Sequence, residues 1–220
     1  MTDGAPGRTG GAWDPVDLVG PSWAVLSSRQ EYRGRVIGVR VDEVRMPGDR
    51  TAVREVIEHP GAVGIVALDE VGQVVLIRQY RHASGGYYIE LPAGLLDVAG
   101  EPALVAAGRE LAEEAALRAQ TWHTLVDVRP SPGMSDEAVR VFLARDLTPV
   151  PEGERYVGFD EETDLDVHRV PLDDAVRAVL AGEIENGVAI AGLLAAAQAR
   201  DAGWAPLRPA SVPWPARSGH

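Results

Sequence analysis

The sequence predicts an α/β fold of the α+β kind, in which helices cover a mixed β-sheet as an α/β/α sandwich and N-terminal antiparallel strands precede it. Two observations support this prediction. Short segments in the first half of the chain alternate apolar and polar residues or are rich in valine, which is typical of strands. Longer segments in the middle and near the end have the spacing of amphipathic helices, so helices are expected to flank the strands.

The strands are expected to fill most of the chain up to residue 91, and further strands follow the middle helix. The turn Asp69-Glu70-Val71-Gly72 separates two apolar runs and predicts a β-hairpin. In order, the predicted strands cover residues 22–30, 36–46, 52–58, 62–68, 73–80, 87–91, 122–128, 138–144 and 165–170.

The middle helix is predicted over residues 102–117. Pro102 favours its first turn, because the N–H that proline lacks would be unpaired there in any case. Alanine and leucine at helical spacing can supply an apolar face, while Gly108 weakens the helix by about 1 kcal/mol relative to alanine. Two later helices are expected over residues 171–181 and 187–200.

The length of the chain fits one domain with flexible ends. Residues 1–20 are rich in glycine, proline and aspartate, which predicts a flexible arm. Residues 21–60 hold the first strands, and residues 61–203 hold the remaining strands and the helices. Residues 204–220 are rich in proline and predict a flexible tail, or a segment that lies extended on a partner surface.

Composition excludes several classes of site and partner. The chain has no cysteine, so disulfides, thiolate metal sites and cysteine nucleophiles are excluded, which is compatible with a cytoplasmic location. No apolar run reaches the roughly 18 residues of a spanning helix, and the first residues lack a signal-peptide pattern, so no membrane partner is expected. The net charge of −12 argues against a nucleic-acid partner, which usually requires a basic face.

The predicted middle helix carries a cluster of carboxylates. Glu110, Glu113 and Glu114 are separated by three and four residues, which places them on one side of a helix. Their mutual repulsion is relieved when a divalent cation binds, and oxygen ligands suit Mg²⁺ or Mn²⁺. Arg109 adjoins the cluster and could orient a glutamate. Without further context, such a run is more often a solvated helix face.

The segment from Gly94 to Leu117, GLLDVAGEPALVAAGRELAEEAAL, resembles the Nudix box. That motif is a glycine, five residues, a glutamate, seven residues, then Arg-Glu, an apolar residue, any residue, Glu-Glu, any residue, glycine and an apolar residue. Glu101 and the residues from Arg109 onward match in register. Two positions depart from it: six residues separate Gly94 from Glu101, and Ala116 replaces the second glycine. Alanine is acceptable there if the position stays helical, although the helix end could shift.

Three further segments, EHPGAVGIVALDE, QYRHASGGYYIELPAGLLDVAGE and SPGMSDEAVRVFLA, resemble the actinobacterial ADP-ribose pyrophosphatase branch of this family, over residues 27–197. This resemblance implies a metal-dependent hydrolase that splits the diphosphate of ADP-ribose into AMP and ribose 5-phosphate, with Mg²⁺ or Mn²⁺ as cofactor. It also implies a homodimer in which residues 21–60 cross between subunits and contribute to the partner's site.

The resemblance also implies roles for residues of the box. Glu110 and Glu114 would hold the metal ions, Glu113 would lie in or next to the metal shell, and the carbonyl of Ala93 would be a further ligand. Arg109 would orient the carboxylates.

Outside the box, Glu162 is expected to position the attacking water, with Glu161 as the alternative and Glu113 as the next candidate. Arg54 and Arg81 are expected to bind the phosphates and ribose of a small nucleotide, because arginine offers forked donors to a diphosphate. Surface salt bridges are the alternative for both arginines. Glu137 is expected to contact the substrate.

Two other functions stay open. The box specifies the diphosphate chemistry but not the groups attached to it, so another nucleoside diphosphate derivative is an alternative substrate. A non-catalytic sensor of ADP-ribose is the alternative from another class. The retained carboxylates and the absence of a helix-turn-helix pattern favour the enzyme.

Overall fold

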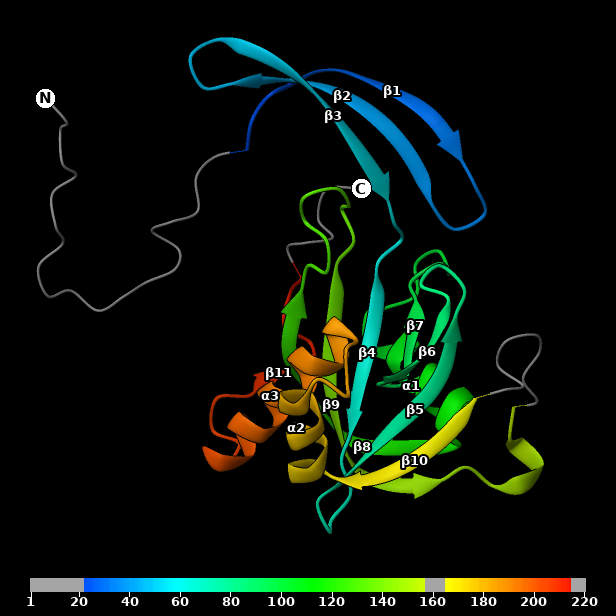
Figure 1. Ribbon diagram of the computed structural model, residues 1–220. Helices are drawn as coiled ribbons and strands as arrows, with labels where there is room; N and C mark the ends of the chain where they lie inside the picture. Colours follow the sequence, from blue (N-terminus) through cyan, green and yellow to red (C-terminus); the bar gives the residue numbers. More distant parts are fainter. Residues whose placement is uncertain (1–21, 157–164, 215–220) are drawn as a thin grey trace, which may run out of the picture.

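The computed structural model describes residues 22–156 and 165–214, which form a sandwich with a separate three-stranded sheet above it (Figure 1). The predicted arm at residues 1–20 lies outside the described residues. The central sheet of the sandwich has the order β11-β8-β9-β4-β7. Its strands are β4 (Ala62–Ala67), β7 (Ala93–Leu95), β8 (Leu117–Val128), β9 (Val139–Pro149) and β11 (Arg208–Pro209). Because β4 and β9 run parallel while the other pairs are antiparallel, the predicted mixed sheet is confirmed.

Two further sheets complete the strands of the described residues. A second sheet has the order β10-β5-β6, with β10 (Asp166–Pro171), β5 (Gln73–Arg81) and β6 (Gly86–Glu90). The third, here called the N-terminal sheet, is an antiparallel meander of β1 (Val25–Arg33), β2 (Gly38–Met46) and β3 (Arg50–Glu58). Figure 1 shows that this N-terminal sheet extends away from the sandwich and joins it at the end of β3.

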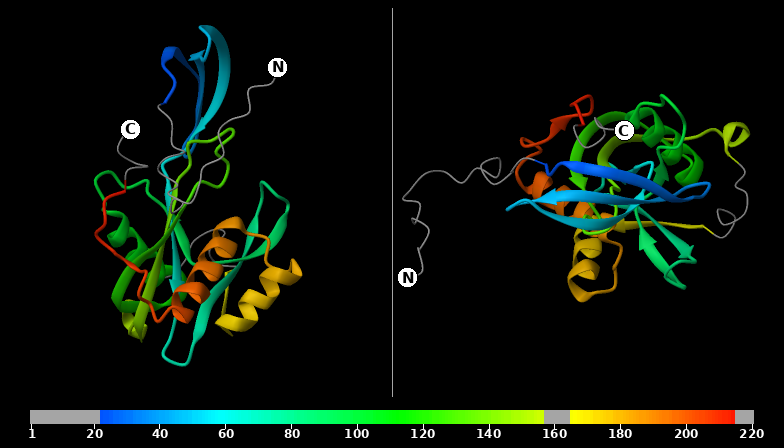
Figure 2. Two further views of the ribbon diagram at one scale, coloured as in Figure 1. Left: turned by 90° about the vertical axis from the view of Figure 1, so that its left-hand side faces the viewer. Right: turned by 90° about the horizontal axis from the view of Figure 1, so that it is seen from above.

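Helices cover both faces of the central sheet (Figure 2). They are α1 (Ala103–Ala115), α2 (Leu172–Ala181) and α3 (Gly187–Asp201); a short 3-10 turn, η2 (Glu152–Glu154), follows β9. Along β4, Val63 and Ile65 pack in the apolar cluster that contains Leu111 of α1, while Val66 packs in the cluster that contains Leu193 of α3. Both faces of β4 are therefore buried, which explains its continuous apolar sequence. None of the helices in the described ranges is long and apolar enough to cross a membrane.

The end of α1 corrects one expectation. Ala116 does not stay helical: it caps the helix in the left-handed conformation, with φ 51° and ψ 39°, and its N–H donates to the carbonyl of Leu111. Glycine is favoured at such a helix end because a Cβ costs about 1–2 kcal/mol in this conformation. Ala116 therefore adopts the backbone conformation that is typical of glycine at this position of the motif. Strand β8 begins at the next residue, Leu117.

The proline-rich end corrects another expectation, because residues 204–214 are not a free tail. β11 pairs with β8, and the hydroxyl of Thr124 donates to the carbonyl of Pro209 at 3.1 Å. The buried Arg140 side chain donates to the carbonyls of Val212 and Pro213 at 2.7 and 3.3 Å, and Trp214 packs against the α1 side of the core. This segment lies against the chain's own central sheet. Residues 215–220 are outside the described residues.

Candidate active site

Five of the predicted site residues on α1 and β7 meet in one open cavity of about 430 Å³. Helix α1 supplies four of them along one face, and β7 supplies the backbone opposite. The helix is held in place because Ala106, Ala107 and Leu111 anchor it in the core. The predicted residues that line the cavity are Ala93, Arg109, Glu110, Glu113 and Glu114, and Arg81 reaches it from β5.

Arg109 is the counter-ion of the carboxylate cluster. Its Nη1 donates to Glu110 Oε1 at 2.7 Å and to Glu113 Oε2 at 2.9 Å, and its other nitrogens donate to both oxygens of Glu101 at 3.2–3.3 Å. The hydrogen bonds to Glu101, with further contributions from Glu110 and Glu113, raise the pKa of Arg109 far above its ordinary value despite partial burial. The repulsion expected between neighbouring carboxylates is thus offset by a fixed positive charge.

The backbone of β7 lies directly against two of the carboxylates. Glu114 Oε2 accepts a hydrogen bond from the N–H of Ala93 at 2.9 Å. A Cβ added at Gly94 would lie 2.0 Å from Cδ and Oε1 of Glu110, so only glycine leaves room for that carboxylate. The first glycine of the box motif is therefore required by close approach, and its φ is not in the left-handed region.

We expect Gly94→Ala to lower kcat/KM by about a hundredfold, because it must displace the Glu110 carboxylate, and small displacements of reacting groups have effects of that size. The measurement is steady-state hydrolysis by the purified protein. Gly108→Ala is the matched control: it makes the same chemical change on α1, meets no atom within 4 Å, and should leave activity unchanged. Equal activity of the two variants would show that Glu110 does not need its position beside Gly94.

The donor set of this cavity fits a hard divalent cation. Glu110, Glu113 and Glu114 offer carboxylate oxygens, which Mg²⁺ and Mn²⁺ prefer, and Gly94 provides the space for one of them. Across the described ranges no three acidic or histidine side chains are already arranged around one point, since Arg109 and the Ala93 N–H hold these carboxylates. The assignment of Ala93, Glu110, Glu113 and Glu114 as ligands stays a prediction.

A second cavity of about 320 Å³ adjoins the first and shares Arg81 and the backbone of residues 93–95 with it. Arg81 donates to the carboxylate of Glu90 at 2.6–3.2 Å, and Glu90 is almost fully buried while the Arg81 side chain is 43% exposed. The salt bridge considered for Arg81 therefore exists, but it holds the guanidinium at the junction of both cavities. Glu137 and His59 also line the second cavity, with Glu137 Oε1 4.0 Å from His59 Nε2.

Of the remaining predicted residues, the structure describes Arg54, which lies away from both cavities. Arg54 lies on β3 of the N-terminal sheet, where its guanidinium donates to the carbonyl of Val53 at 2.8 Å, and it lines neither cavity. Glu161 and Glu162 lie outside the described residues. Glu90 and Gln79 are among the lining residues that were not identified from the sequence, although the alternation of the two strands around them places both on the side of Arg81.

Comparison with known proteins identifies relatives over most of the chain. The NUDIX domain family matches residues 58–190, and the family described as nucleoside diphosphate sugar hydrolase N-terminal domain matches residues 23–57. An ADP-ribose pyrophosphatase of Mycobacterium tuberculosis is 48% identical over 86% of this chain and 89% of its own length. An ADP-ribose pyrophosphatase of Bacillus subtilis is 33% identical over 72% of this chain and 84% of its own length.

A solved structure shares the fold. The crystal structure of an ADP compounds hydrolase superposes with a TM-score of 0.70, covering 83% of this chain and 97% of that one at 23% identity. At this identity the likeness shows the fold, so the predicted α+β sandwich is confirmed.

Proposed function

The chain belongs to the Nudix family and is a pyrophosphohydrolase of that family, and from this premise we propose that it hydrolyses ADP-ribose to AMP and ribose 5-phosphate. The observation that carries the proposal is the cavity in which Arg109, Glu110, Glu113 and Glu114 face the backbone of β7, with Arg81 at its border. The 48% identity to an ADP-ribose pyrophosphatase supports this substrate over other nucleoside diphosphate derivatives.

Members of this family generally need a divalent metal ion, and Mg²⁺ or Mn²⁺ is the proposed cofactor. Glu110 and Glu114 would hold it, the carbonyl of Ala93 would be a further ligand, and Glu113 would lie in or next to the metal shell. When bound, such an ion neutralises diphosphate charge and lowers the pKa of a bound water. The chain's own contribution is to align these carboxylates through Arg109 and the N–H of Ala93.

Other residues are proposed to bind the substrate and guide the water. Arg81 can donate to the diphosphate from the junction of the two cavities while Glu90 fixes its direction. Glu137 is proposed to contact the sugar or base from the second cavity. Glu162 is proposed to position the attacking water, with Glu161 and then Glu113 as alternatives, and no covalent enzyme intermediate is required.

The proposed assembly is a homodimer in which the N-terminal sheet covers a partner subunit. This sheet exposes several large apolar side chains, and a single subunit buries them poorly. They are Val25, Leu26, Tyr32 and Val53, together with Trp23 just before β1, and they are 42–61% exposed. A partner subunit beneath the sheet would bury this surface and would bring Arg54 to a second active site. The proposed location is the cytoplasm. A chain without cysteine does not rely on disulfides, which is compatible with a reducing compartment, and nucleotide substrates are abundant there.

The substrate is tested by a parallel assay of ADP-ribose, ADP-glucose, GDP-mannose, NADH and diadenosine polyphosphates, each with Mg²⁺ and with Mn²⁺. We expect ADP-ribose to give the highest kcat/KM and to yield AMP and ribose 5-phosphate in equal amounts. A higher kcat/KM for another compound would assign the same site to that substrate. No turnover of any compound, together with measurable binding of ADP-ribose, would favour a sensor and contradict the proposed enzyme.

A further inference from the structure

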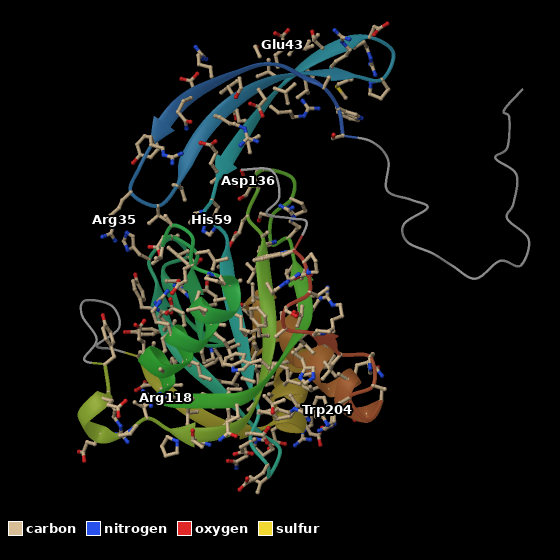
Figure 3. The ribbon with its side chains drawn as sticks, turned by 180° about the vertical axis from the view of Figure 1, so that it is seen from behind. Arg35, Glu43, His59, Arg118, Asp136 and Trp204 are labelled. Carbon is tan, nitrogen blue, oxygen red and sulfur yellow. The ribbon has the colours of Figure 1, made fainter. Side chains whose placement is uncertain are left out.

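The loop between β8 and β9, residues 129–138, joins the N-terminal sheet to the sandwich (Figure 3). Its backbone pairs with the end of β3: the N–H of Ile57 donates to the carbonyl of Met134 at 2.8 Å, and the N–H of Asp136 donates to the carbonyl of Ile57 at 3.1 Å. These two bonds attach the end of β3 in the N-terminal sheet to the loop.

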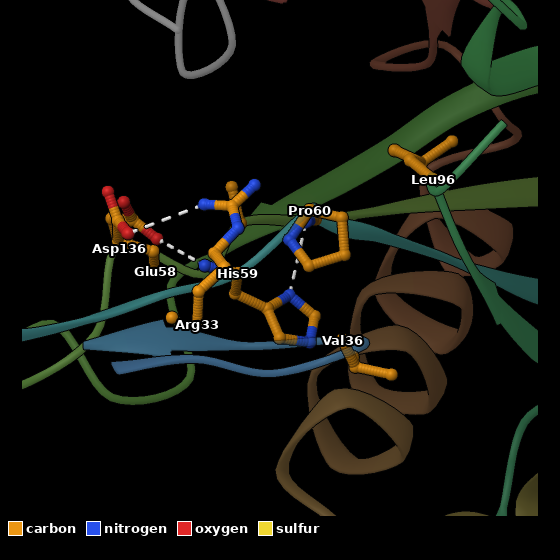
Figure 4. Close-up of a pocket in the computed structure, with 10 residues that line it drawn as sticks. Arg33, Val36, Glu58, His59, Pro60, Leu96 and Asp136 are labelled. Atoms are coloured by element: carbon orange, nitrogen blue, oxygen red, sulfur yellow. Dashed lines mark hydrogen bonds and ion pairs between the residues drawn. The ribbon is translucent and has the colours of Figure 1, made fainter. Parts of the chain in front are cut away.

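The Asp136 carboxylate adds a side-chain attachment at the same place. Its Oδ1 accepts a hydrogen bond from the N–H of His59 at 2.9 Å, and its Oδ2 accepts one from Arg40 Nη1 at 3.3 Å. One acceptor is thus attached to the connection, and the other to the middle strand of the N-terminal sheet. The Asp136 side chain is only 15% exposed. Figure 4 shows it with Glu58 and His59 at the junction between the end of β3 and the loop of residues 129–138. Partial burial strengthens such bonds to a charged group relative to a surface pair.

The bond to Arg40 connects Asp136 to all three strands of the sheet. Arg40 also donates to Asp42 at 2.9 Å and to Glu58 at 3.4 Å, and Ser28 of β1 donates to Asp42 at 2.6 Å. Burial would raise the pKa of Asp42, but the bonds from Ser28 and Arg40 outweigh it and lower that pKa. Asp42 therefore stays ionised at neutral pH. Ser28, Arg40, Asp42 and Glu58 form a charged network within the N-terminal sheet, and the hydrogen bond from Arg40 to Asp136 connects this network to the sandwich.

Asp136 also contacts or adjoins two residues that line the second cavity, His59 and Glu137. Glu137 follows Asp136 directly, and His59, whose N–H bonds to Asp136, turns its ring toward Glu137, with its Nδ1 held by the N–H of Gly61 at 3.1 Å. We propose that Asp136 is a positioning residue for substrate binding: by holding His59 and Arg40 at once, it fixes Glu137 in its cavity and sets the direction of the N-terminal sheet that carries Arg54. This inference rests on the proposed function for its substrate, but its geometry stands on this chain's contacts.

The first test is the kinetic pattern of Asp136→Asn. The amide keeps the size and one acceptor but loses the charge toward Arg40, so Glu137 and Arg54 should bind substrate less well while the metal carboxylates stay in place. We expect the KM for ADP-ribose to rise about tenfold with kcat changed less than about twofold, as when binding common to the ground and transition states is lost. Arg40→Gln should give the same pattern, and the double variant should be little worse than either single variant.

Asp49→Asn is the matched control, because it makes the same change at an exposed turn of the N-terminal sheet, away from the junction. It should leave both constants unchanged. A lowered melting temperature of Asp136→Asn with unchanged KM would reduce Asp136 to a structural role and overturn the proposal. A loss of kcat at constant KM would also overturn it.

The second test does not depend on activity. The chain has no cysteine, so cysteines introduced at the exposed Thr51 and Leu180 accept spin labels uniquely, and mixing with unlabelled protein removes signals between subunits. Asp136→Asn should broaden the distance distribution between the sheet and α2, and Asp49→Asn should not. An unchanged narrow distance distribution would show that Asp136 does not set the direction of the N-terminal sheet and would overturn this coupling between Asp136 and the sheet. If the wild type fails to hydrolyse ADP-ribose, the proposed function fails, whereas this distance measurement still decides the coupling.

Discussion

Glu110→Gln and Glu114→Gln should each lower kcat by about a thousandfold while the protein stays folded, a size typical for removal of a charge that stabilises the transition state. Glutamine keeps the shape of the side chain, so Arg109 can still donate to position 110 and the N–H of Ala93 to position 114. What the amide loses is the negative charge that would hold a divalent ion. The measurement is kcat at saturating ADP-ribose over a range of Mg²⁺ concentrations, beside a thermal melt.

Glu154→Gln is the control for this pair, since Glu154 is an exposed acid that pairs with Arg118 at 2.7 Å outside the cavity. It should behave as the wild type. Near-normal turnover of Glu110→Gln or Glu114→Gln at limiting Mg²⁺ would show that these carboxylates are not the metal ligands.

Removal of residues 1–58 should abolish dimerisation and activity together. The deletion removes β1, β2 and β3, and with them Arg54 and the exposed apolar surface proposed to cover a partner. The central sheet begins only at Ala62, so its core keeps all of its strands. Light scattering gives the mass of the truncated protein, and the ADP-ribose assay gives its activity.

Two further variants make this truncation decisive. Removal of residues 1–15 should change neither property, because the strands begin at Val25. Arg54→Ala should leave the dimer intact and raise KM, which separates the loss of a substrate contact from the loss of assembly. A truncated protein without residues 1–58 that is monomeric and fully active would show that the dimer model is wrong.

Much of the fold follows from local patterns in the sequence. The middle helix, predicted over residues 102–117, is observed as α1, and both later helices agree with prediction within a residue or two. Each of these helices buries one face, so the spacing of its apolar residues along the sequence indicates a helix. Strands β7 and β11 were not predicted, because each is very short and is defined by pairing with a distant strand.

The corrected regions depend on tertiary contacts that a local pattern does not contain. Ala116 adopts a glycine-like conformation because β8 must start immediately after α1. The proline-rich end is held by the buried Arg140, whose bonds to two distant carbonyls leave no trace in the tail's own composition.

Some features of the candidate site could likewise be predicted from local spacing, whereas others depend on tertiary contacts. The carboxylates of α1 could be placed together because helical spacing fixes them, and the structure gathers them in one cavity with Ala93 and Arg81. The spacing did not show that Arg109 would donate to both Glu110 and Glu113, or that Gly94 makes room for Glu110. Arg54 lies on the N-terminal sheet and lines neither cavity, so its role in substrate binding stays a prediction that relies on the proposed dimer.

The central claim is that this cavity performs metal-dependent hydrolysis of the diphosphate in ADP-ribose. The most direct measurement is a chromatographic time course of ADP-ribose with the full chain in Mg²⁺, after addition of excess EDTA, and after Mg²⁺ is restored. We predict equal amounts of AMP and ribose 5-phosphate in Mg²⁺, no products in EDTA, and recovery when the ion is returned. Unchanged product formation in EDTA, or products other than this pair, would contradict the claim.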